Sequence, residues 1–115
     1  MTVLIVDDHA SFRSTARLLL EAEGYDVVGE AADGAAGLRA AGELHPNLVL
    51  LDVHLPDLDG FDVAARLTGQ NGAPRVVLTS SREAADFGPL VGRSGASGFV
   101  PKNELSGEAL AAILG

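Results

Sequence analysis

The chain has 115 residues, enough for one domain with its own buried core, and a net charge of −8 with only eight Lys and Arg residues. Because affinity for nucleic acids comes mainly from basic side chains, this balance argues against direct nucleic-acid binding. The lack of cysteine excludes disulfides and thiolate metal sites, and no apolar run is long enough for a membrane span. Since Met1 leads directly into a strand without a signal sequence, we expect a cytoplasmic protein that binds other proteins and a metal cation.

Short apolar runs alternate along the chain with longer amphipathic stretches, which predicts five strands and five helices. The strands are expected at residues 3–6, 26–31, 47–51, 75–79 and 97–100. Several are apolar on both faces, as in a parallel sheet that helices cover on both sides. Right-handed crossovers then favour an α/β, doubly wound five-stranded sheet in the order 2-1-3-4-5, with the first and third strands adjacent.

The first two helices have recognisable boundaries. Four apolar residues at helical spacing predict the first helix, and they are Phe12, Ala16, Leu19 and Leu20. Gly24 is placed to end this helix. Asp33 can cap a second helix near residues 34–44, although its internal glycines weaken it by about 1 kcal/mol each relative to alanine.

The last three helices differ in strength. Asp59 and Gly60 open the third helix, and Ser106 is a good N-cap for the fifth. The fourth helix is expected between Glu83 and Arg93, but three residues there weaken a helix, namely Gly88, Pro89 and Gly92. Together they would cost about 5 kcal/mol as interior positions, so we expect a short or distorted segment.

Acidic residues end two of the predicted central strands. Asp7 and Asp8 follow the first strand, and Asp52 follows the third. Adjacent strands bring the three carboxylates together, and at an effective dielectric near 20 their repulsion is on the order of 10 kcal/mol. A hard dication with oxygen ligands offsets this repulsion, and Mg²⁺ suits a shallow site with few carboxylates. The alternative is that each aspartate only caps a turn.

Four motifs resemble the receiver domain of two-component response regulators over essentially the whole chain. They are Val3-Leu4-Ile5-Val6-Asp7-Asp8, Leu51-Asp52-Val53-His54-Leu55-Pro56 followed by Asp59-Gly60, Val77-Leu78-Thr79-Ser80, and Gly95-Ala96-Ser97-Gly98-Phe99-Val100-Pro101-Lys102. The last motif is most similar to receivers of the LuxR/NarL/FixJ type, which precede a helix-turn-helix domain. No output domain follows in this sequence. We therefore expect one receiver domain over residues 1–115, either a stand-alone protein or a domain of a longer regulator, with a CheY-like, flavodoxin-like fold.

The resemblance implies a phosphoacceptor rather than a turnover enzyme. Asp52 would accept a phosphoryl group from a phosphohistidine on a sensor histidine kinase or a phosphotransfer protein. Asp8, the Asp52 carboxylate and the backbone carbonyl of His54 would ligate Mg²⁺, with Asp7 acting through a water on the metal. Lys102 would contact a phosphoryl oxygen and pair with Asp52 before phosphorylation.

The same resemblance implies a switch. Thr79 would donate its hydroxyl to the phosphoryl group, and Phe99 would turn inward into the space that Thr79 leaves. The surface of the fourth helix, fifth strand and fifth helix would then shift and act on an output domain or effector protein, or form a homodimer. Alternatively, Thr79 is an ordinary strand residue and Phe99 is plain core.

Two departures from the family pattern surround Lys102. Many receivers have a proline after this lysine, whereas here Asn103 follows, so the Lys102-Asn103 bond is expected to be trans because a cis bond would cost about 2.5–4 kcal/mol. Pro101 precedes the lysine, which an edge strand tolerates. The position of Lys102 is therefore less constrained than that of Asp52.

Histidine side chains are not expected to bind the magnesium ion. His9 and His54 lie near the acids, but imidazole is a poorer ligand for Mg²⁺ than oxygen, so we expect these rings to face solvent or tune rates. His45 is expected at the surface.

Other functions fit the residues less well. A flavodoxin-like cofactor site would be repelled by the acids of the first loop, and an aspartate-nucleophile phosphatase would need a cap for which no insertion exists. A receiver-like adaptor that binds proteins independently of phosphorylation stays open as the main alternative.

Overall fold

The computed structural model describes residues 1–81 and 87–115. Its sheet has five parallel strands in the order β2-β1-β3-β4-β5, which confirms the predicted doubly wound topology. The strands are β1 (Thr2–Val6), β2 (Asp26–Ala31), β3 (Leu48–Asp52), β4 (Arg75–Ser80) and β5 (Gly98–Pro101). Each lies within one or two residues of its predicted bounds, and β2 and β5 form the two edges.

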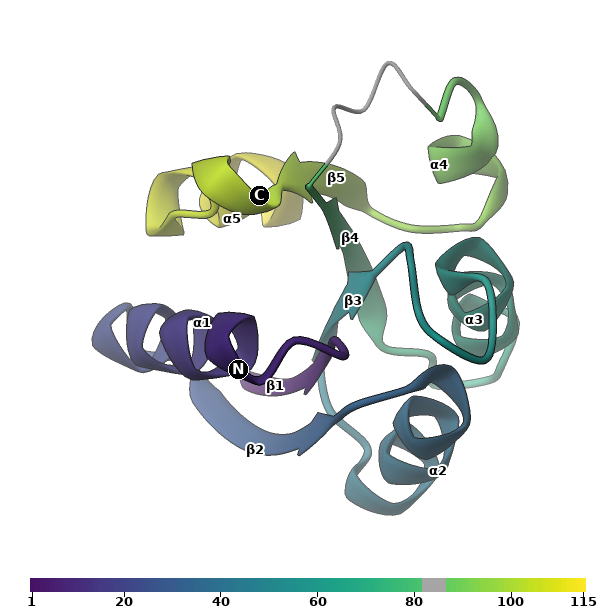
Figure 1. The fold of residues 1–115 in the computed structure, drawn as a ribbon, viewed down its shortest axis with the longest axis horizontal. Coiled ribbons are helices and arrows are strands. Elements are labelled where there is room, and N and C mark those ends of the chain that lie inside the picture. The colour runs from purple at the N-terminus through teal and green to yellow at the C-terminus, as the bar shows by residue number, and fades with distance from the viewer. Residues whose placement is uncertain (82–86) are drawn as a thin grey trace.

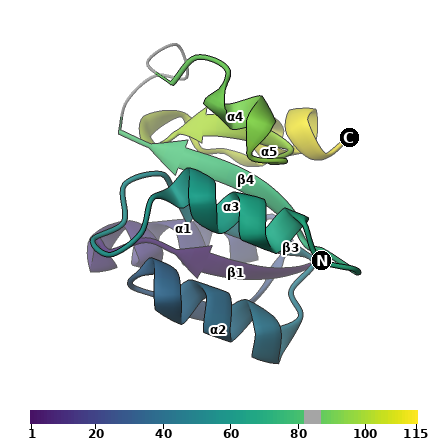
Figure 2. The ribbon, with the colours of Figure 1, turned by 90° about the vertical axis from the view of Figure 1, so that its right-hand side faces the viewer.

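Helices cover both faces of this sheet (Figure 1). One face carries α1 (Ala10–Ala22) and α5 (Gly107–Leu114), and the other carries α2 (Gly34–Leu44), α3 (Gly60–Thr68) and α4 (Leu90–Arg93). Figure 2 views the second face, with α2, α3 and α4 in front of the strands. Among the described residues, no helix has both the length and the apolar character that a membrane crossing requires.

The two central strands form the middle of the core. Residues 3–6 of β1 and 48–51 of β3 are at most 1% exposed, because helices cover both of their faces. Leu4 and Leu51 belong to the cluster beneath α2 and α3, whereas Ile5 and Leu50 pack with residues of α1 and α5. This alternation accounts for the uninterrupted apolar runs in the sequence, and it places the strand ends on a firmly packed base.

The predicted helix boundaries are confirmed where the sequence contains a capping residue. The side chains of Asp33, Asp59 and Ser106 accept hydrogen bonds from backbone N–H groups in the first turns of α2, α3 and α5. Gly24 follows the end of α1 with φ of +91°, a conformation that strains any residue with a side chain. These contacts satisfy groups that the helix ends leave without partners.

The fourth helix is short in its described part. It is one turn, Leu90–Arg93, preceded by a turn in which Gly88 has φ of +56°. The part of the predicted helix between Glu83 and Asp86 lies outside the described residues. A 3₁₀ turn, Lys102–Glu104, which the sequence patterns do not predict, links β5 to the loop before α5.

Candidate functional site

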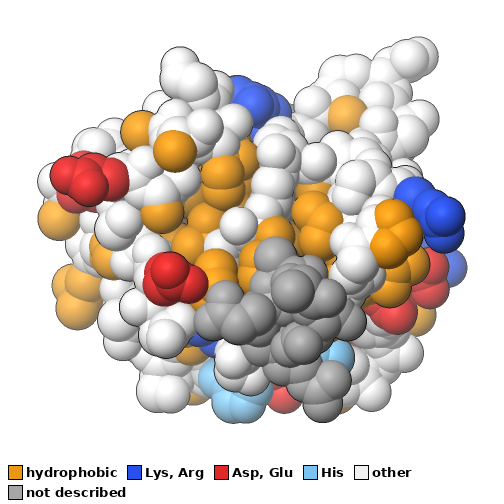
Figure 3. All heavy atoms as spheres, turned by 90° about the horizontal axis from the view of Figure 1, so that it is seen from above, with side chains coloured by type: hydrophobic (Ala, Val, Ile, Leu, Met, Phe, Trp, Pro, Cys, Tyr) orange, Lys and Arg blue, Asp and Glu red, His pale blue; other side chains and the backbone are white. Residues whose placement is uncertain are grey.

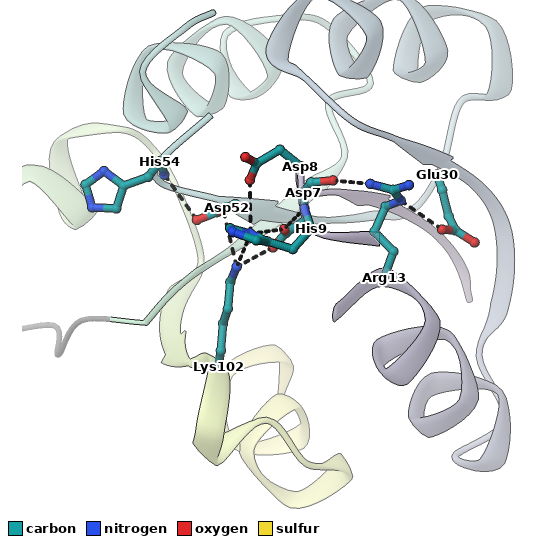
Figure 4. A network of polar contacts seen from close by, with 8 residues as sticks. All are labelled: Asp7, Asp8, His9, Arg13, Glu30, Asp52, His54 and Lys102. Atoms are coloured by element: carbon teal, nitrogen blue, oxygen red, sulfur yellow. Dashed lines mark hydrogen bonds and ion pairs between the residues drawn. The ribbon is translucent and has the colours of Figure 1, made fainter. Parts of the chain in front are cut away.

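The carboxylates of Asp7, Asp8 and Asp52 converge at the carboxyl ends of β1 and β3. The parallel register pairs Val6 with Leu51, so the residues that follow them in each strand lie side by side. Asp7 is 1% exposed and Asp52 is 2% exposed, while Asp8 is exposed. Ligand atoms of these acids and of His9 all lie within 4.8 Å of one another (Figure 4). The predicted meeting of the acids is therefore confirmed.

Lys102 extends its ammonium group into this cluster. Its Nζ lies 2.7 Å from Asp7 Oδ2 and 3.3 Å from Asp52 Oδ2, and 4.7 Å from the centre of the Phe12 ring. The expected pairing with Asp52 is present, but the contact with Asp7 is closer. Among the described residues no peptide bond is cis, in agreement with a trans bond after Lys102. The 3₁₀ turn at Lys102 thus presents the lysine without a following proline.

Burial and charge shift the pKa values of Asp52 and Lys102. Burial raises the pKa of the Asp52 carboxyl above its usual value, and the charge of Asp7 adds to this rise. The backbone N–H of His54 and the Lys102 ammonium oppose it in part. Burial by itself lowers the pKa of Lys102, but its contacts with Asp7 and Asp52 outweigh burial and raise that pKa. A single lysine therefore leaves the carboxylates incompletely neutralised.

Thr79 and Phe99 lie on the strands next to Asp52. Thr79 pairs in register with Asp52, and its carbonyl accepts a hydrogen bond of 2.9 Å from the N–H of Val53. The Thr79 hydroxyl is buried and has no hydrogen-bond partner among the described residues. Phe99, in β5, is partly exposed, and its ring centre is 5.4 Å from that of Phe87. The geometry leaves the switch role and the packing role of Phe99 both open.

The loop after β3 folds tightly around Asp52. The N–H of His54 donates to Asp52 Oδ1 at 3.1 Å, and the N–H of Gly60 donates to the Val53 carbonyl at 2.8 Å. An added Cβ at Gly60 would lie 2.6 Å from Val53 Cα and even closer to the Asp52 carbonyl oxygen. Only glycine therefore allows α3 to start this close to the phosphoacceptor candidate.

Two further residues position this end of the sheet, and neither is singled out by the sequence patterns. Asp57 accepts hydrogen bonds from the N–H groups of Gly34 and Ala35, at 2.7 and 3.0 Å, which fastens the loop after β3 to the start of α2. These bonds hold the pKa of the Asp57 carboxyl below its usual value. Arg13 donates to the Asp7 carbonyl at 2.7 Å and also pairs with Glu30. The residue pattern does not show these contacts, because they depend on how the loops after β1 and β3 fold.

The three histidines occupy different surroundings. The His9 side chain is 62% exposed, yet its Nδ1 lies 3.1 Å from Asp7 Oδ1 and 3.1 Å from Asp8 Oδ1. The ring of His54 points away from the acids in Figure 4 and lies 5.8 Å from the Phe87 ring. His45 is exposed at the end of α2, as predicted. The His9 ring is exposed as predicted, and its Nδ1 in addition contacts the acidic cluster.

The profile of the response regulator receiver domain matches residues 3–114. The chain belongs to this family. Receivers of the family are phosphoacceptor modules of two-component signalling rather than turnover enzymes. The predicted family and class of protein are therefore confirmed.

This receiver is similar to regulators of the LuxR/NarL type. It is 44% identical to BvgA of Bordetella pertussis over 102 residues, which cover 89% of this chain and 49% of BvgA. The signal receiver domain of NarL from Mycobacterium tuberculosis is 34% identical, with a TM-score of 0.85 and coverage of 99% of this chain and 96% of that one. A LuxR-family regulator from Aurantimonas sp. SI85-9A1 is 32% identical, with a TM-score of 0.87 and coverage of 98% and 81%.

The receiver spans about half the length of the curated relatives that it matches. Its acidic cluster fits a hard dication, because carboxylate oxygens surround a space whose negative charge Lys102 only partly balances. The buried Thr79 hydroxyl, in register with Asp52 and without a partner among the described residues, is a further polar group at this end of the sheet. The acidic cluster is typical of the magnesium site of a receiver.

Proposed function

We propose that this receiver is a phosphorylation switch in which Asp52 is the phosphoacceptor. The observation that supports this role is the position of the carboxylate, buried at the end of β3 beside Asp7 and 3.3 Å from the Lys102 ammonium. A phosphohistidine of a sensor histidine kinase or phosphotransfer protein is the proposed donor. Residues 1–115 would act as one receiver domain in the cytoplasm.

Phosphotransfer requires a nucleophile, charge compensation and a leaving group. A carboxylate oxygen of Asp52 attacks phosphorus, a P–O bond forms, and the P–N bond of the donor breaks. The electron pair stays on the donor imidazole, which takes up a proton from solvent. Lys102 contacts a phosphoryl oxygen as a compact positive charge, and Thr79 donates its hydroxyl to another. The product is an aspartyl phosphate at Asp52.

Three oxygen donors would hold Mg²⁺, namely the carboxylates of Asp8 and Asp52 and the backbone carbonyl of His54, with Asp7 in the outer shell. When bound, the metal supplies positive charge that reduces repulsion between the anionic nucleophile and the anionic donor. The N–H of His54 already contacts Asp52, so the loop after β3 holds the His54 backbone beside the acids. The tight approach of Gly60 supports this placement.

The proposed output surface consists of α4, β5 and α5. Figure 3 views the molecule from the side on which these elements lie in Figure 1, and hydrophobic side chains gather across this face. Engagement of Thr79 by the phosphoryl group would move the end of β4, and Phe99 on the neighbouring strand would turn inward. The altered face would then bind an output domain, an effector protein or a second copy of the chain.

The decisive experiment measures intact mass after incubation with acetyl phosphate and Mg²⁺. One added phosphoryl group is expected on the wild-type chain and on Asp62→Asn, which removes an exposed acid from α3. No adduct is expected on Asp52→Asn, or on the wild-type chain when a chelator removes the metal. An adduct on Asp52→Asn would contradict the assignment of the phosphoacceptor.

Rapid hydrolysis of the acyl phosphate could hide the mass adduct. The control for this uses beryllofluoride, which mimics the phosphoryl group and does not hydrolyse. Amide NMR spectra are recorded with and without beryllofluoride, and shifts are expected in β4, β5 and α5. If neither an adduct nor these shifts appear, the proposal fails and the chain is a phosphorylation-independent adaptor.

A further inference from the structure

The loop between β3 and α3 is attached to the fold at both of its ends. At the β3 end, the N–H of His54 donates to Asp52 Oδ1 at 3.1 Å. At the α3 end, Asp59 accepts a hydrogen bond of 2.8 Å from the N–H of Phe61 and pairs with His54 in an isolated antiparallel bridge. Asp57 lies in the exposed middle of the loop. Its contacts therefore determine whether the middle of the loop is held as well.

Asp57 holds the middle of this loop with both of its carboxylate oxygens. Oδ1 accepts the N–H of Gly34 at 2.7 Å, and Oδ2 accepts the N–H of Ala35 at 3.0 Å. These residues begin α2, and N–H groups at the start of a helix have no partner inside it. The approach is close, since an added Cβ at Gly34 would lie 2.9 Å from the Leu58 side chain and 3.2 Å from Asp57 Oδ1. The two-point contact of Asp57 with α2 therefore depends on a glycine at the helix start.

The start of α2 is in turn joined to the other side of the acidic cluster. Ala31, the last residue of β2, lies shortly before Gly34, and its carbonyl accepts the N–H of Asp7 at 3.0 Å. The segment between β2 and α2 therefore holds Asp7 at one end and Asp57 at the other. Through this segment, the loop after β1 and the loop after β3 are tied together around the acids.

We propose that Asp57 is a positioning residue for the metal site, because its contact with α2 sets where the backbone carbonyl of His54 lies relative to the acids. The inference rests on the proposed function, in which this carbonyl is a ligand of Mg²⁺. Mg²⁺ demands nearly ideal octahedral geometry, so a displaced carbonyl weakens its binding although Asp57 does not touch the ion. Residues that orient a metal ligand directly change metal affinity by about 10- to 100-fold. Asp57 acts through the intervening backbone of the loop, so a smaller loss of about three- to tenfold is expected.

The test measures Mg²⁺ affinity by amide NMR titration of the full chain and three variants. Asp57→Ala removes both acceptors and is expected to bind Mg²⁺ about three- to tenfold more weakly than the wild-type chain. Asp57→Asn keeps an oxygen acceptor for the Gly34 N–H and is expected to bind Mg²⁺ more tightly than Asp57→Ala. Asp33→Ala is the matched control, since it removes one negative charge and one cap from the start of the same helix but leaves the contact of Asp57 in place. It is expected to bind Mg²⁺ like the wild-type chain.

A second readout follows the contact itself in the wild-type chain. If the contact of Asp57 strengthens Mg²⁺ binding, Mg²⁺ must strengthen that contact by the same factor, because coupling between two sites is reciprocal. Saturating Mg²⁺ is therefore expected to shift the N–H signals of Gly34 and Ala35, and this response is expected to persist in Asp33→Ala and to be lost in Asp57→Ala. Unchanged signals in the wild-type chain reject the inference even if a variant fails to fold. Equal Mg²⁺ affinities of Asp57→Ala and the wild-type chain, or an equal loss in Asp33→Ala, would also overturn it.

These measurements contain no phosphoryl donor, so the two proposals can fail separately. Weakened Mg²⁺ binding in Asp57→Ala, without a mass adduct or a beryllofluoride response on the wild-type chain, would support the positioning role and reject the phosphorylation switch. A Mg²⁺-dependent adduct on Asp52, with Mg²⁺ affinity independent of Asp57, would have the opposite meaning.

Discussion

Two regions of the molecule differ in how deeply their residues are buried. One is the acidic end of β1 and β3, and the other is the face formed by α4, β5 and α5. Strands β1 and β3 are central, their apolar residues are almost completely buried, and their ends carry the acids. By contrast, β5 is an edge strand, none of the residues of α4 is buried, and Leu90 is 44% exposed. The chemical groups therefore sit on the firmest part of the fold, and the proposed output surface on a less firmly packed part.

This difference in packing suits a switch that has a fixed chemical site and a movable output surface. A carboxylate that must meet a phosphoryl group and a metal gains from fixed geometry, because small misplacements weaken both interactions. A surface that has two arrangements needs a small free-energy difference between them, and few buried contacts keep that difference small. Substitutions matched between the two regions test this contrast.

The largest effect on the free energy of unfolding is expected from truncating a leucine in strand β3. Leu50 in β3 is 1% exposed and packs between strands and helices α1 and α5, so Leu50→Ala should lower the free energy of unfolding by about 2–5 kcal/mol. Leu90→Ala in α4 removes a half-exposed side chain and should change it by about 0.5 kcal/mol or less. Urea unfolding followed by circular dichroism measures both changes in the free energy of unfolding. Equal losses would show that the two regions are packed alike.

Two glycine substitutions, one in each region, compare how closely the backbone is packed. An added methyl at Gly60 meets backbone atoms of Asp52 and Val53, so Gly60→Ala should cost about 1–3 kcal/mol. An added methyl at Gly92 in α4 has no atom within 4 Å, so Gly92→Ala should stabilise the chain by about 0.5–1 kcal/mol. Thermal unfolding of the two variants shows whether each substitution raises or lowers the stability. A stable Gly60→Ala chain would mean that the loop after β3 moves easily.

The sequence predicts the central region well. Apolar runs that end in acids predict β1 and β3 and the meeting of Asp7, Asp8 and Asp52, because two adjacent parallel strands always bring their ends together. Caps at Asp33, Asp59 and Ser106 are equally local signals. In these places the interaction that decides the structure lies within a few residues or follows from the strand order.

Contacts between distant segments are less predictable. Asp57 holds the start of α2 across more than 20 positions of the chain, and Lys102 lies closer to Asp7 than to Asp52. The ring of His9 faces solvent as expected, but the contacts of its Nδ1 with the acids depend on the path of the loop after β1 and are not predicted by the residue pattern. Such side-chain directions depend on tertiary packing, which residue patterns do not encode.

The smallest effect concerns the charge of Asp52 and depends on pH. Burial raises the pKa of this carboxyl above the value of 3.8 that an unperturbed aspartate has. Between 3.8 and the raised pKa, the folded chain keeps a proton that the unfolded chain has released, so stability falls as pH rises through this window. Asp52→Asn avoids this loss, since asparagine stays neutral and keeps an oxygen for the His54 N–H. Without metal at pH 7, we expect Asp52→Asn to be more stable than the wild-type chain.

Unfolding curves in urea at several pH values, recorded with a chelator, measure this difference. The gain of Asp52→Asn over the wild-type chain should shrink as pH falls and vanish below about 3.8, where both side chains are neutral in both states. Asp62→Asn is the matched control, because Asp62 is exposed in the first turn of α3, where a negative charge favours the helix. Its removal should cost a few tenths of a kcal/mol at pH 7, opposite in sign to Asp52→Asn. A loss of stability in both variants would mean that Lys102 already balances the charge of the cluster, and the need for a bound cation would disappear.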